Sequence, residues 1–580
     1  MKKTNKNKYF NKVGGMALID GVMMKSQEKI ASAIRNPKTL DIEVIETKLN
    51  DSKYKVFKKI PIIRGVFAFI ESMYTGITEI TRSAKDMEFE DEDGNEETLT
   101  DNEIMFSLVI SVFLAIGLFL LLPNIITNFI FPIKNAENKL YYVITESIIK
   151  LTIFIIYIVG ISKMEEIKTV FKYHGAEHKA IACIENKNKV DVKTAKKCTR
   201  FHPRCGTSFI VLVLIISIIV SYFINTNIFW LRVIYKLLLL PVIAGISYEA
   251  IVFSNKYDNI ITKVIKFPGL MLQRITTKEP EEEHLECAIA AMLAALSEYN
   301  YITIKDAIIK YVKEYKIESS EALRIIAKYL NKDKNKIYIN MDKEYLDYKD
   351  FINIQNRVKK YKIDNIPLQY ILNSQDFYGL DMYIEEGVLV PRSDTEILVE
   401  EVINAIEKNN YKTAIDMCCG SGCVGIAVAK NTSLEKVYSV DISEKAEKVT
   451  KINIEKQEVT NINFVKSDLF KNLKNKKVDI IMSNPPYIES SEILKLDKIV
   501  QNEPHLALDG GNSGLDFYEK IANEARKYLN DNGTLIFEIG YKQGNKVKNI
   551  LKKYEEYSNI KVIKDLAKNE RVVICHFHKI

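Results

Sequence analysis

The chain has 580 residues, which at roughly 100–200 residues per domain is too long for one ordinary core. Charged residues make up 27% and hydrophobic residues 47%, values that exclude a wholly disordered chain. The net charge of +7 is too small for this length to indicate a nucleic-acid-binding protein by charge alone. Eight cysteines do not make a disulfide framework, and the adjacent Cys418 and Cys419 fit a reducing compartment.

Residues 1–87 are predicted to form a cytoplasmic N-terminal region. Their basic start is not a signal peptide, because Asp20 and Gly21 interrupt the apolar stretch that follows it. Residues 32–37 and 39–49 alternate like short strands, and 61–87 have helical periodicity. That helix could lie on a membrane surface, but its pattern favours packing against the rest of the protein. The next segment, 88–103, has nine acidic residues and almost nothing apolar, which predicts a solvated linker.

Residues 104–255 are predicted to be a membrane module, because about 20 apolar residues suffice to cross a bilayer. The four candidate spans are 104–122, 144–162, 207–224 and 230–253. Late in the fourth span, Glu249 is an ionisable residue at membrane depth and a functional candidate. Eleven Lys and Arg residues lie in the connection 163–206, against two in 132–140. The positive-inside rule therefore predicts a multi-pass protein of the cell membrane, in contact with membrane lipid, with 163–206 and both termini in the cytoplasm.

The loop 163–206 holds three of the seven histidines, in YHGAEHKAIACIE and CTRFHPRCG. His174 and His178 are one helical turn apart, so HGAEH matches the H-x-x-E-H pattern of two metal ligands with a carboxylate base, here Glu177. His202 is the fourth member of the predicted divalent metal site, for which zinc is the expected ion. The alternative is a polar helix beside the membrane whose histidines face solvent or headgroups. Further candidate ligands in this loop are Cys198 and Cys205.

Residues from about 12 to 297 resemble an uncharacterised bacterial membrane family that is sometimes described as metal-dependent. The matching stretches are VGGMALIDGVMMKS (13–26), PIIRGVFAFIES (61–72), YHGAEHKAIACIE (173–185), HPRCGTSF (202–209), LLLPVIAGISYE (238–249) and GLMLQRITTKEPEEEHLECAIAAM (269–292). Met16 stands where that family generally has Gln. The resemblance implies kinship but no particular reaction. A metallohydrolase, a transporter or sensor module, and a passive anchor for the C-terminal half all stay open.

After a tail and linker at 256–301, the C-terminal half is predicted to hold a small helical domain at 302–366 and an α/β domain at 367–580. Segments within 302–363 have helical spacing. Beyond residue 412 apolar strand-like runs alternate with helical ones, which indicates a mostly parallel sheet. The predicted fold class is multidomain: an α-helical membrane module with a small cytoplasmic α/β part, a small helical domain, and a C-terminal Rossmann-like α/β domain. The runs are TAIDM, VYSVD, INFVKSD, VDIIMSN, GTLIFEIG, KVIKDL and VVICHF.

Three consecutive strand ends in this domain carry groups suited to S-adenosylmethionine. The first strand, which contains Asp416, runs into a turn and then a helix whose N-terminus offers free N–H groups. Asp441 ends the second strand, where a carboxylate can accept both ribose hydroxyls of a nucleoside. After the third strand, Asp468 could reach the adenine amine and Leu469 could cover its ring. NAD is the alternative, although the full G-x-G-x-x-G is lacking. The turn is Cys418, Cys419, Gly420, Ser421 and Gly422.

The fourth strand leads directly into Asn484-Pro485-Pro486-Tyr487, which predicts transfer of a methyl group to an amide or amine nitrogen. Such a nitrogen is a poor nucleophile because its lone pair is delocalised. The Asn484 side-chain carbonyl and the Pro485 backbone carbonyl can accept both N–H protons and so aim the lone pair. Tyr487 can pack over the planar amide. Alignment then supplies most of the rate, without a strong general base.

Residues 302–580 resemble the bacterial peptide-chain-release-factor N5-glutamine methyltransferase family over their whole length. Beyond NPPY, the matching stretches are PLQYILNSQDFYGLDMYIEEGVLVPRSDTEILVE (367–400), IDMCCGSGCVGIAVAK (415–430), EPHLALDGGNSGLDFYEKI (503–521) and KDLAKNERVVIC (564–575). At Ser393-Asp394 the family usually has Pro-Glu. By this resemblance Cys418 to Gly422, Asp441, Leu469 and Asn484 would bind S-adenosylmethionine, and Asn484 to Tyr487 would hold the substrate glutamine.

The resemblance also implies the substrate, the partner and the role of the helical domain. The substrate would be the glutamine of the Gly-Gly-Gln motif of a release factor, and 302–366 would recognise that partner. The main rival is an N6-adenine or rRNA amino methyltransferase, because NPPY occurs in those enzymes too. The PLQYI and EPHLAL stretches favour the release-factor family, and no added base-recognition domain is evident in 302–580. Direct nucleic-acid binding is therefore not expected.

Overall fold

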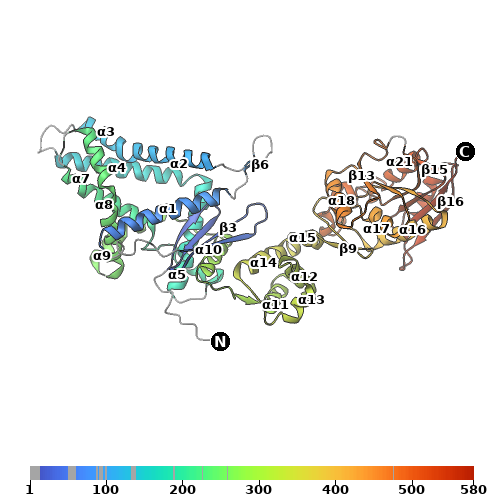
Figure 1. Ribbon diagram of the computed structural model, residues 1–580, viewed down its shortest axis with the longest axis horizontal. Coiled ribbons are helices and arrows are strands. Elements are labelled where there is room, and N and C mark those ends of the chain that lie inside the picture. Colours follow the sequence, from blue (N-terminus) through green and yellow to red (C-terminus); the bar gives the residue numbers. More distant parts are fainter. Residues whose placement is uncertain are drawn as a thin grey trace. The chain divides into compact units, whose positions relative to one another are not determined.

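Figure 1 shows the computed structural model of the chain. It describes all residues except 1–12, 50–59, 86–88, 91–95, 98–100, 132–138, 187–189, 225, 227, 258 and 474–475. The chain divides into two compact units, Met1–Ala307 with Met341–Asn356, and Ile308–Asn340 with Arg357–Ile580. The segment 302–366, predicted to be one helical domain, therefore contributes residues to both units.

A four-stranded antiparallel sheet lies in the first unit, in the order β1-β2-β3-β4. The strands are β1 (Gly14–Leu18), β2 (Gly21–Lys25), β3 (Lys29–Arg35) and β4 (Ile42–Lys48). The predicted strands at 32–37 and 39–49 are confirmed as β3 and β4. β1 and β2 were not predicted, because the Asp20-Gly21 turn between them was interpreted only as a break in an apolar stretch. Helices α5 (Glu165–Glu185) and α10 (Glu282–Ala295) pack on the sheet.

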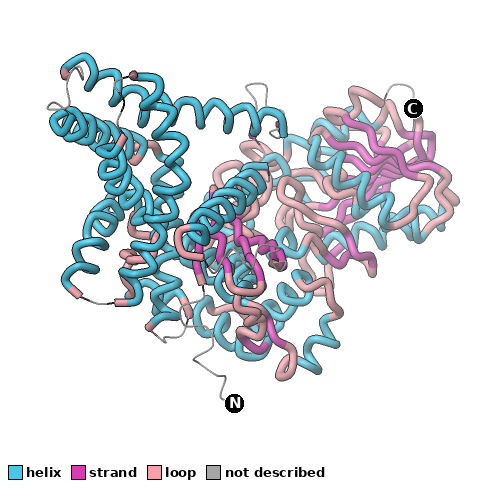
Figure 2. Tube along the Cα trace, turned by 60° about the vertical axis from the view of Figure 1, so that its left-hand side comes forward, coloured by secondary structure: helices cyan, strands magenta, loops and turns pink. Residues whose placement is uncertain are grey.

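Four helices in the described part of the chain are long and apolar enough to cross a membrane: Met105–Ile130, Lys139–Ile161, Gly206–Phe223 and Phe229–Ser254. The first consists of α2 (Asp101–Ile116), the π-helix η2 (Gly117–Leu121) and α3 (Leu122–Ile130). The others are α4 (Lys139–Ile161), α7 (Gly206–Phe223) and α8 (Phe229–Lys256). Four helices long and apolar enough to be spans thus lie at approximately the predicted positions. Figure 2 shows these long helices gathered on one side of the small sheet.

The predicted helix at 61–87 is confirmed as α1 (Ile63–Lys85), and it packs along α8. The approach is close, since a Cβ added at Gly65 would lie 2.9 Å from the backbone oxygen of Gly245. Arg64 donates from Nε to Glu249 Oε1 at 2.7 Å. Glu249, a functional candidate by its depth alone, is thus the ion-pair partner that fixes α1 on the fourth span. The predicted linker 88–103 lies mostly outside the described residues; those described form the short pair β5 (Phe89–Glu90) and β6 (Glu96–Glu97) and the start of α2 at Asp101.

Short helices make up most of the remaining connections. In the first unit the loop after α5 contains α6 (Val192–Lys197), and α9 (Ile260–Thr276) precedes α10. The predicted helical segment contains α11 (Ile304–Tyr315), α12 (Ser319–Tyr329), α13 (Lys334–Asn340) and α14 (Tyr348–Lys362), with the short pair β7 (Ile302–Thr303) and β8 (Tyr345–Leu346). Next come α15 (Leu368–Leu372) and the hairpin β9 (Gln375–Phe377) and β10 (Leu380–Met382).

All seven predicted strands of the α/β domain are present in one sheet, in the order β13-β12-β11-β14-β15-β17-β16. The first five are parallel, and β17 pairs antiparallel with β15 and β16. The strands are β11 (Thr413–Met417), β12 (Lys436–Asp441), β13 (Ile462–Lys466), β14 (Val478–Ser483), β15 (Leu529–Glu538), β16 (Tyr557–Lys564) and β17 (Glu570–Phe577). The helices are α16 (Glu396–Asn409), α17 (Cys423–Asn431), α18 (Glu444–Lys456), α19 (Lys498–Gln501), α20 (His505–Leu508), α21 (Asp516–Ala525) and α22 (Gly544–Leu551), with 3₁₀ turns η4 (Ser393–Thr395) and η5 (Ile493–Lys495).

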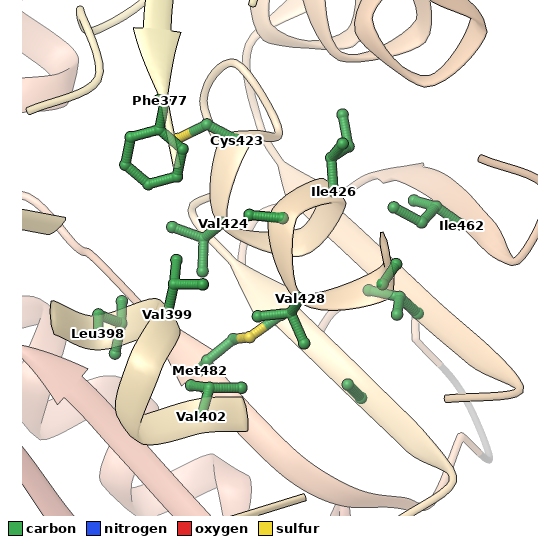
Figure 3. Close-up of a cluster of buried hydrophobic side chains, with 14 of the residues drawn as sticks. Phe377, Leu398, Val399, Val402, Cys423, Val424, Ile426, Val428, Ile462 and Met482 are labelled. Atoms are coloured by element: carbon green, nitrogen blue, oxygen red, sulfur yellow. The ribbon is translucent and has the colours of Figure 1, made fainter. Parts of the chain in front are cut away.

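Both faces of this sheet are covered by helices, because side chains alternate between the faces along each strand. Ala414 belongs to a buried cluster with residues of α16 and α17, which Figure 3 shows in close-up. Its neighbour Ile415 belongs to the opposite cluster, with residues of α21 and α22. The strand order reverses between β11 and β14, and ligands of such sheets bind in the crevice at this switch point.

Candidate functional site

A cavity of about 320 Å³ lies at the carboxyl ends of β11, β12 and β14. Among the predicted cofactor and substrate residues, Gly422, Pro485 and Tyr487 are outside its lining. The cavity is lined by ten of the others: Asp416, Cys418, Cys419, Gly420, Ser421, Asp441, Asp468, Leu469, Asn484 and Pro486. The topology thus brings together strand-end groups that lie up to 70 residues apart in sequence.

The turn after β11 has a backbone that most residues avoid. Gly420 and Gly422 have φ of +55° and +76°, and Cys418 is left-handed as well, at +62°. At Gly422 a Cβ would lie 2.7 Å from Thr450 Cγ2, so glycine is required both by conformation and by space. Cys418 has a side chain, so its left-handed conformation costs conformational free energy. The same holds for Leu469, which has a φ of +49° and lies across the cavity. Two non-glycine residues in left-handed conformations thus lie on opposite walls of this cavity.

Two carboxyl groups, the buried Asp416 and the half-buried Asp441, hold the start of α17 and the turn before it in place. Asp416 Oδ2 accepts from the backbone N–H of Gly425 at 2.9 Å, and burial raises the pKa of Asp416 to about 7. Asp441 accepts from the backbone N–H of Gly420 at 2.9 Å, and burial also raises its pKa. Asp441 therefore joins the end of β12 to the turn after β11, in addition to the ribose contact predicted for it.

The thiols and the third strand end have different surroundings. Burial raises the pKa of the Cys418 and Cys419 thiols above their usual range, so both are neutral and act as small wall residues. Asp468 forms an ion pair with Lys471 at the cavity edge. Its carboxylate is half-exposed, whereas Leu469 is buried.

Asn484 is oriented by a residue that the sequence reasoning did not single out. Its Nδ2 donates to Thr395 Oγ1 at 3.3 Å, which leaves Oδ1 as an acceptor beside the cavity. Tyr487 instead points into the protein, where its hydroxyl donates to Glu538 Oε1 at 3.4 Å. Burial raises the pKa of Glu538 to about 7. The NPPY loop is thus anchored on one side by Thr395 and on the other by Glu538.

Two stretches, VPRSDTE and EPHLAL, which the sequence analysis used only as evidence of the family resemblance, lie together at the cavity wall. In VPRSDTE, Arg392 forms an ion pair with the buried Glu503 of EPHLAL. The other oxygen of Glu503 accepts from the backbone N–H of Val390 at 2.9 Å. Pro391 and Thr395 from the first stretch, with Leu506 from the second, line the cavity. No periodicity or spacing in the sequence could have shown that segments more than 100 residues apart share one wall.

A separate cluster in the first unit brings together His174, His178 and Cys205. One ligand atom from each residue lies within 4.8 Å of the others. His174 Nδ1 donates to Thr276 O at 2.9 Å and His178 Nδ1 donates to Arg200 O at 2.5 Å. Both rings therefore carry their proton on Nδ1 and present the lone pair of Nε2. His174 Nε2 lies 3.1 Å from Cys205 Sγ, and the buried His178 Nε2 has no partner among the described residues.

The other candidate ligands surround this cluster without entering it. The ring of His202 lies 5.7 Å from that of His178, but its Nε2 faces Glu185 Oε1 at 3.1 Å. Cys198 lies 3.1 Å from Cys183, sulfur to sulfur. Glu177 is fully buried, which raises its pKa, and its carboxyl lies against Gly15 of β1. Cys205, which the sequence offered only as a further candidate, is the third member of the cluster.

The N-terminal and C-terminal halves of the chain match different families of known proteins. Residues 60–298 match a family model described as a protein of unknown function (DUF1385), and residues 393–494 match one described as a methyltransferase small domain. The uncharacterized protein YqhQ of Bacillus subtilis is 35% identical over 304 residues, which cover 50% of this chain and 94% of that protein.

The remaining half is similar to proteins named release factor glutamine methyltransferase. That of Clostridium acetobutylicum is 38% identical over 287 residues, covering 47% of this chain and 98% of the relative. That of Clostridium botulinum is 40% identical over 260 residues, covering 44% and 90%. The chain therefore belongs to two families at once, the YqhQ family through its N-terminal half and the release factor glutamine methyltransferase family through its C-terminal half.

Proposed function

We propose that the C-terminal half methylates the side-chain amide nitrogen of the glutamine in the Gly-Gly-Gln motif of peptide chain release factors. The observation that carries this proposal is the single cavity that joins the turn 418–421 and Asp441 to Asn484. Relatives named for this reaction support the choice of substrate. The PLQYI and EPHLAL stretches favour it over an N6-adenine or rRNA amino methyltransferase.

The residues present fit S-adenosylmethionine, which when bound supplies an electrophilic methyl group. Asp441, at the end of β12, would accept the ribose hydroxyls, and the buried Leu469 would cover the adenine. The backbone at 418–422 comes close to the cavity because its glycines have left-handed conformations. This donor set is a carboxylate, backbone amides and apolar walls, which suits a nucleoside with a cationic group.

The chain's own contribution to the reaction is positioning of the glutamine amide. Asn484 Oδ1, fixed by the bond from Nδ2 to Thr395, would accept one N–H proton, and the Pro485 carbonyl would accept the other. Holding both protons turns the nitrogen lone pair toward the methyl donor. Tyr487, bonded to Glu538, would act by holding the loop rather than by covering the amide as predicted from the sequence. Leaving one amide proton unpaired in the closed site would cost about 1–3 kcal/mol.

The test uses the full chain in detergent with methyl-labelled S-adenosylmethionine. Three acceptors are offered in parallel: a release factor, the same factor with Gln→Ala in its Gly-Gly-Gln motif, and DNA or rRNA. We expect label in the intact release factor alone. Label in nucleic acid would overturn the substrate, and equal label in the Gln→Ala factor would overturn the acceptor nitrogen.

We further propose that the N-terminal half binds a divalent metal ion, most naturally zinc, through His174, His178 and Cys205. The supporting observation is that one ligand atom from each of the three residues lies within 4.8 Å of the others, while both Nδ1 protons are held by backbone carbonyls. Imidazole nitrogens and thiolate sulfurs are both zinc ligands, and three protein ligands leave a fourth position open; the donor atoms would lie about 3.5 Å apart around the ion. Glu177 would stand beside the ion as a buried carboxylate, an arrangement that favours a metallohydrolase over a passive anchor.

The metal content of the full chain tests this second proposal. After reconstitution with Zn²⁺ and removal of excess metal, we expect one zinc per chain, lost in His178→Ala and in Cys205→Ser. His202→Ala is the matched control, because His202 packs against His178 but faces Glu185. A wild-type protein that retains no metal, or a His202→Ala variant that loses as much as His178→Ala, would refute the ligand set.

We infer that both termini, the loop 163–206 and the methyltransferase domain lie in the cytoplasm. The eleven Lys and Arg residues of 163–206 support this orientation of the four apolar helices. Alkaline phosphatase fused to the C-terminus should be inactive in cells, and a fluorescent protein at the same position should be bright. An active phosphatase fusion would reverse the topology.

A further inference from the structure

A second cavity, of about 310 Å³, lies among the apolar helices of the first unit, between α2, α4, α7 and α8. Its walls are almost entirely apolar, with residues such as Phe119, Leu214 and Ile243. Two lysines, Lys150 and Lys236, are part of the lining. Among the described residues that line it there is no acidic side chain, and the other polar groups are two serines of α7. The cavity therefore presents positive charge inside an otherwise hydrocarbon-like space.

The depth of Lys150 makes this charge unusual. Lys150 is the central residue of α4 (Lys139–Ile161), eleven residues from each end. At 1.5 Å per residue it is roughly 16 Å from either end of the helix. A bilayer core is about 30 Å thick, so Lys150 lies near its middle. Charged residues at such depth are costly and are retained for a partner or a function.

The neighbouring charges do not balance the two lysines. Glu146 forms an ion pair with Lys236, which also donates to Asn124 Oδ1 at 3.2 Å. The buried Arg232 lies over the ring of Tyr142, 4.5 Å from its centroid, and adds a third cation. Lys150 donates to the hydroxyl of Ser217 at 3.2 Å, a neutral partner. Among the described residues, three cations thus share one carboxylate, and two of the cations, Lys150 and Lys236, line the cavity.

We propose that this cavity binds a lipid-like ligand, an oxyanion attached to a hydrocarbon chain. Lys150 and Lys236 would bind the anionic group, and the apolar walls would contact the hydrocarbon chain. A buried charge is stabilised only by a counter-charge and hydrogen bonds, and an anion from outside the protein supplies both. The apolar lining distinguishes this ligand from a small hydrated anion. Long-chain carboxylates and lipid phosphates share the required chemistry. The site is separate from the metal cluster and the methyltransferase cavity, and its occupancy does not depend on either proposal.

The experiment measures saturable binding of tritiated oleate to the full chain in a neutral detergent. Competitors are unlabelled oleate, oleoyl-lysophosphatidate, oleyl alcohol and inorganic phosphate. We expect unlabelled oleate and oleoyl-lysophosphatidate to compete with the tritiated oleate. The competitor with the higher affinity then shows whether a carboxylate or a phosphate is the preferred anionic group. Lys150→Met should weaken oleate binding roughly 10- to 100-fold, which is the range for one charge-assisted hydrogen bond. Lys139→Met, on the same helix but outside the cavity, is the matched control and should stay within about twofold of wild type.

Each remaining outcome decides against the proposal. If oleyl alcohol competes as strongly as oleate, the negative charge of the ligand plays no part in binding. If inorganic phosphate competes as strongly as oleate, the acyl chain of the ligand plays no part. Unchanged binding in Lys150→Met would also overturn it. Lys236→Met alone would leave the Glu146 carboxylate buried without its ion-pair partner. The second variant therefore combines Lys236→Met with Glu146→Gln, so that both positions are uncharged. That pair should fold and should lose oleate affinity to a similar extent as Lys150→Met.

Discussion

Replacing Asn484 by alanine is the most direct test of how the methyltransferase cavity works. Asn484 Oδ1 is an acceptor beside the cavity, fixed because Nδ2 donates to Thr395 at 3.3 Å. Without it one N–H of the substrate amide is left unpaired, which costs about 1–3 kcal/mol and slows the reaction roughly 5- to 150-fold. Thr395→Val removes the hydrogen bond that anchors Asn484 but keeps the Asn484 amide oxygen. A net hydrogen bond is worth about 0.5–1.5 kcal/mol, so this variant should be about 2- to 12-fold slower.

Initial rates of label transfer to a release factor measure both effects, with calorimetric titration of S-adenosylmethionine beside them. We expect the rates to fall in the order wild type, Thr395→Val, Asn484→Ala, with donor affinity changed less than the rate. Asn409→Ala, an exposed asparagine at the end of α16, is the control. Thr395→Val slower than Asn484→Ala would refute the anchoring role of Thr395. A loss of donor affinity as large as the rate loss would make Asn484 a donor-binding residue only.

Three further predictions concern the same domain. Asp441→Asn should weaken S-adenosylmethionine binding about tenfold in calorimetric titration, because a charged acceptor is lost; unchanged affinity would remove Asp441 from the site. Gly422→Ala should lower thermal stability by about 1–3 kcal/mol, and by more than Gly379→Ala, whose φ of +75° is similar but whose surroundings are open; equal losses would exclude the clash with Thr450. Glu538 has a folded pKa of about 7, above its ordinary value of 4.5, so the stability that its neutral form contributes is complete below pH 4.5 and is lost as the pH rises through 7. Glu538→Gln should therefore gain stability relative to wild type between pH 5 and pH 8, by up to about 3 kcal/mol, and parallel melting curves across that range would contradict the assignment.

Local composition determined much of this molecule in advance. Apolar runs long enough to cross a bilayer identify spans from sequence alone, because the free energy of transfer depends on the residues of that one segment. The seven strands of the α/β domain and the residues at their ends were predictable for a similar reason. Parallel topology brings the carboxyl ends of strands to one edge, so Asp416, Asp441 and Asn484 had to lie near one another.

The tertiary structure alone decided which side chains meet across long sequence separations. Thr395 orients Asn484, Glu503 joins the two stretches of the cavity wall, and Glu538 takes Tyr487 out of the cavity. In the membrane half, the cluster includes Cys205, while His202 faces Glu185. Lys150 and Lys236 come from different helices and share one cavity. Each of these contacts depends on how the helices and strands pack against one another. Because the packing energy is spread over many contacts, the sequence of one segment does not determine the arrangement.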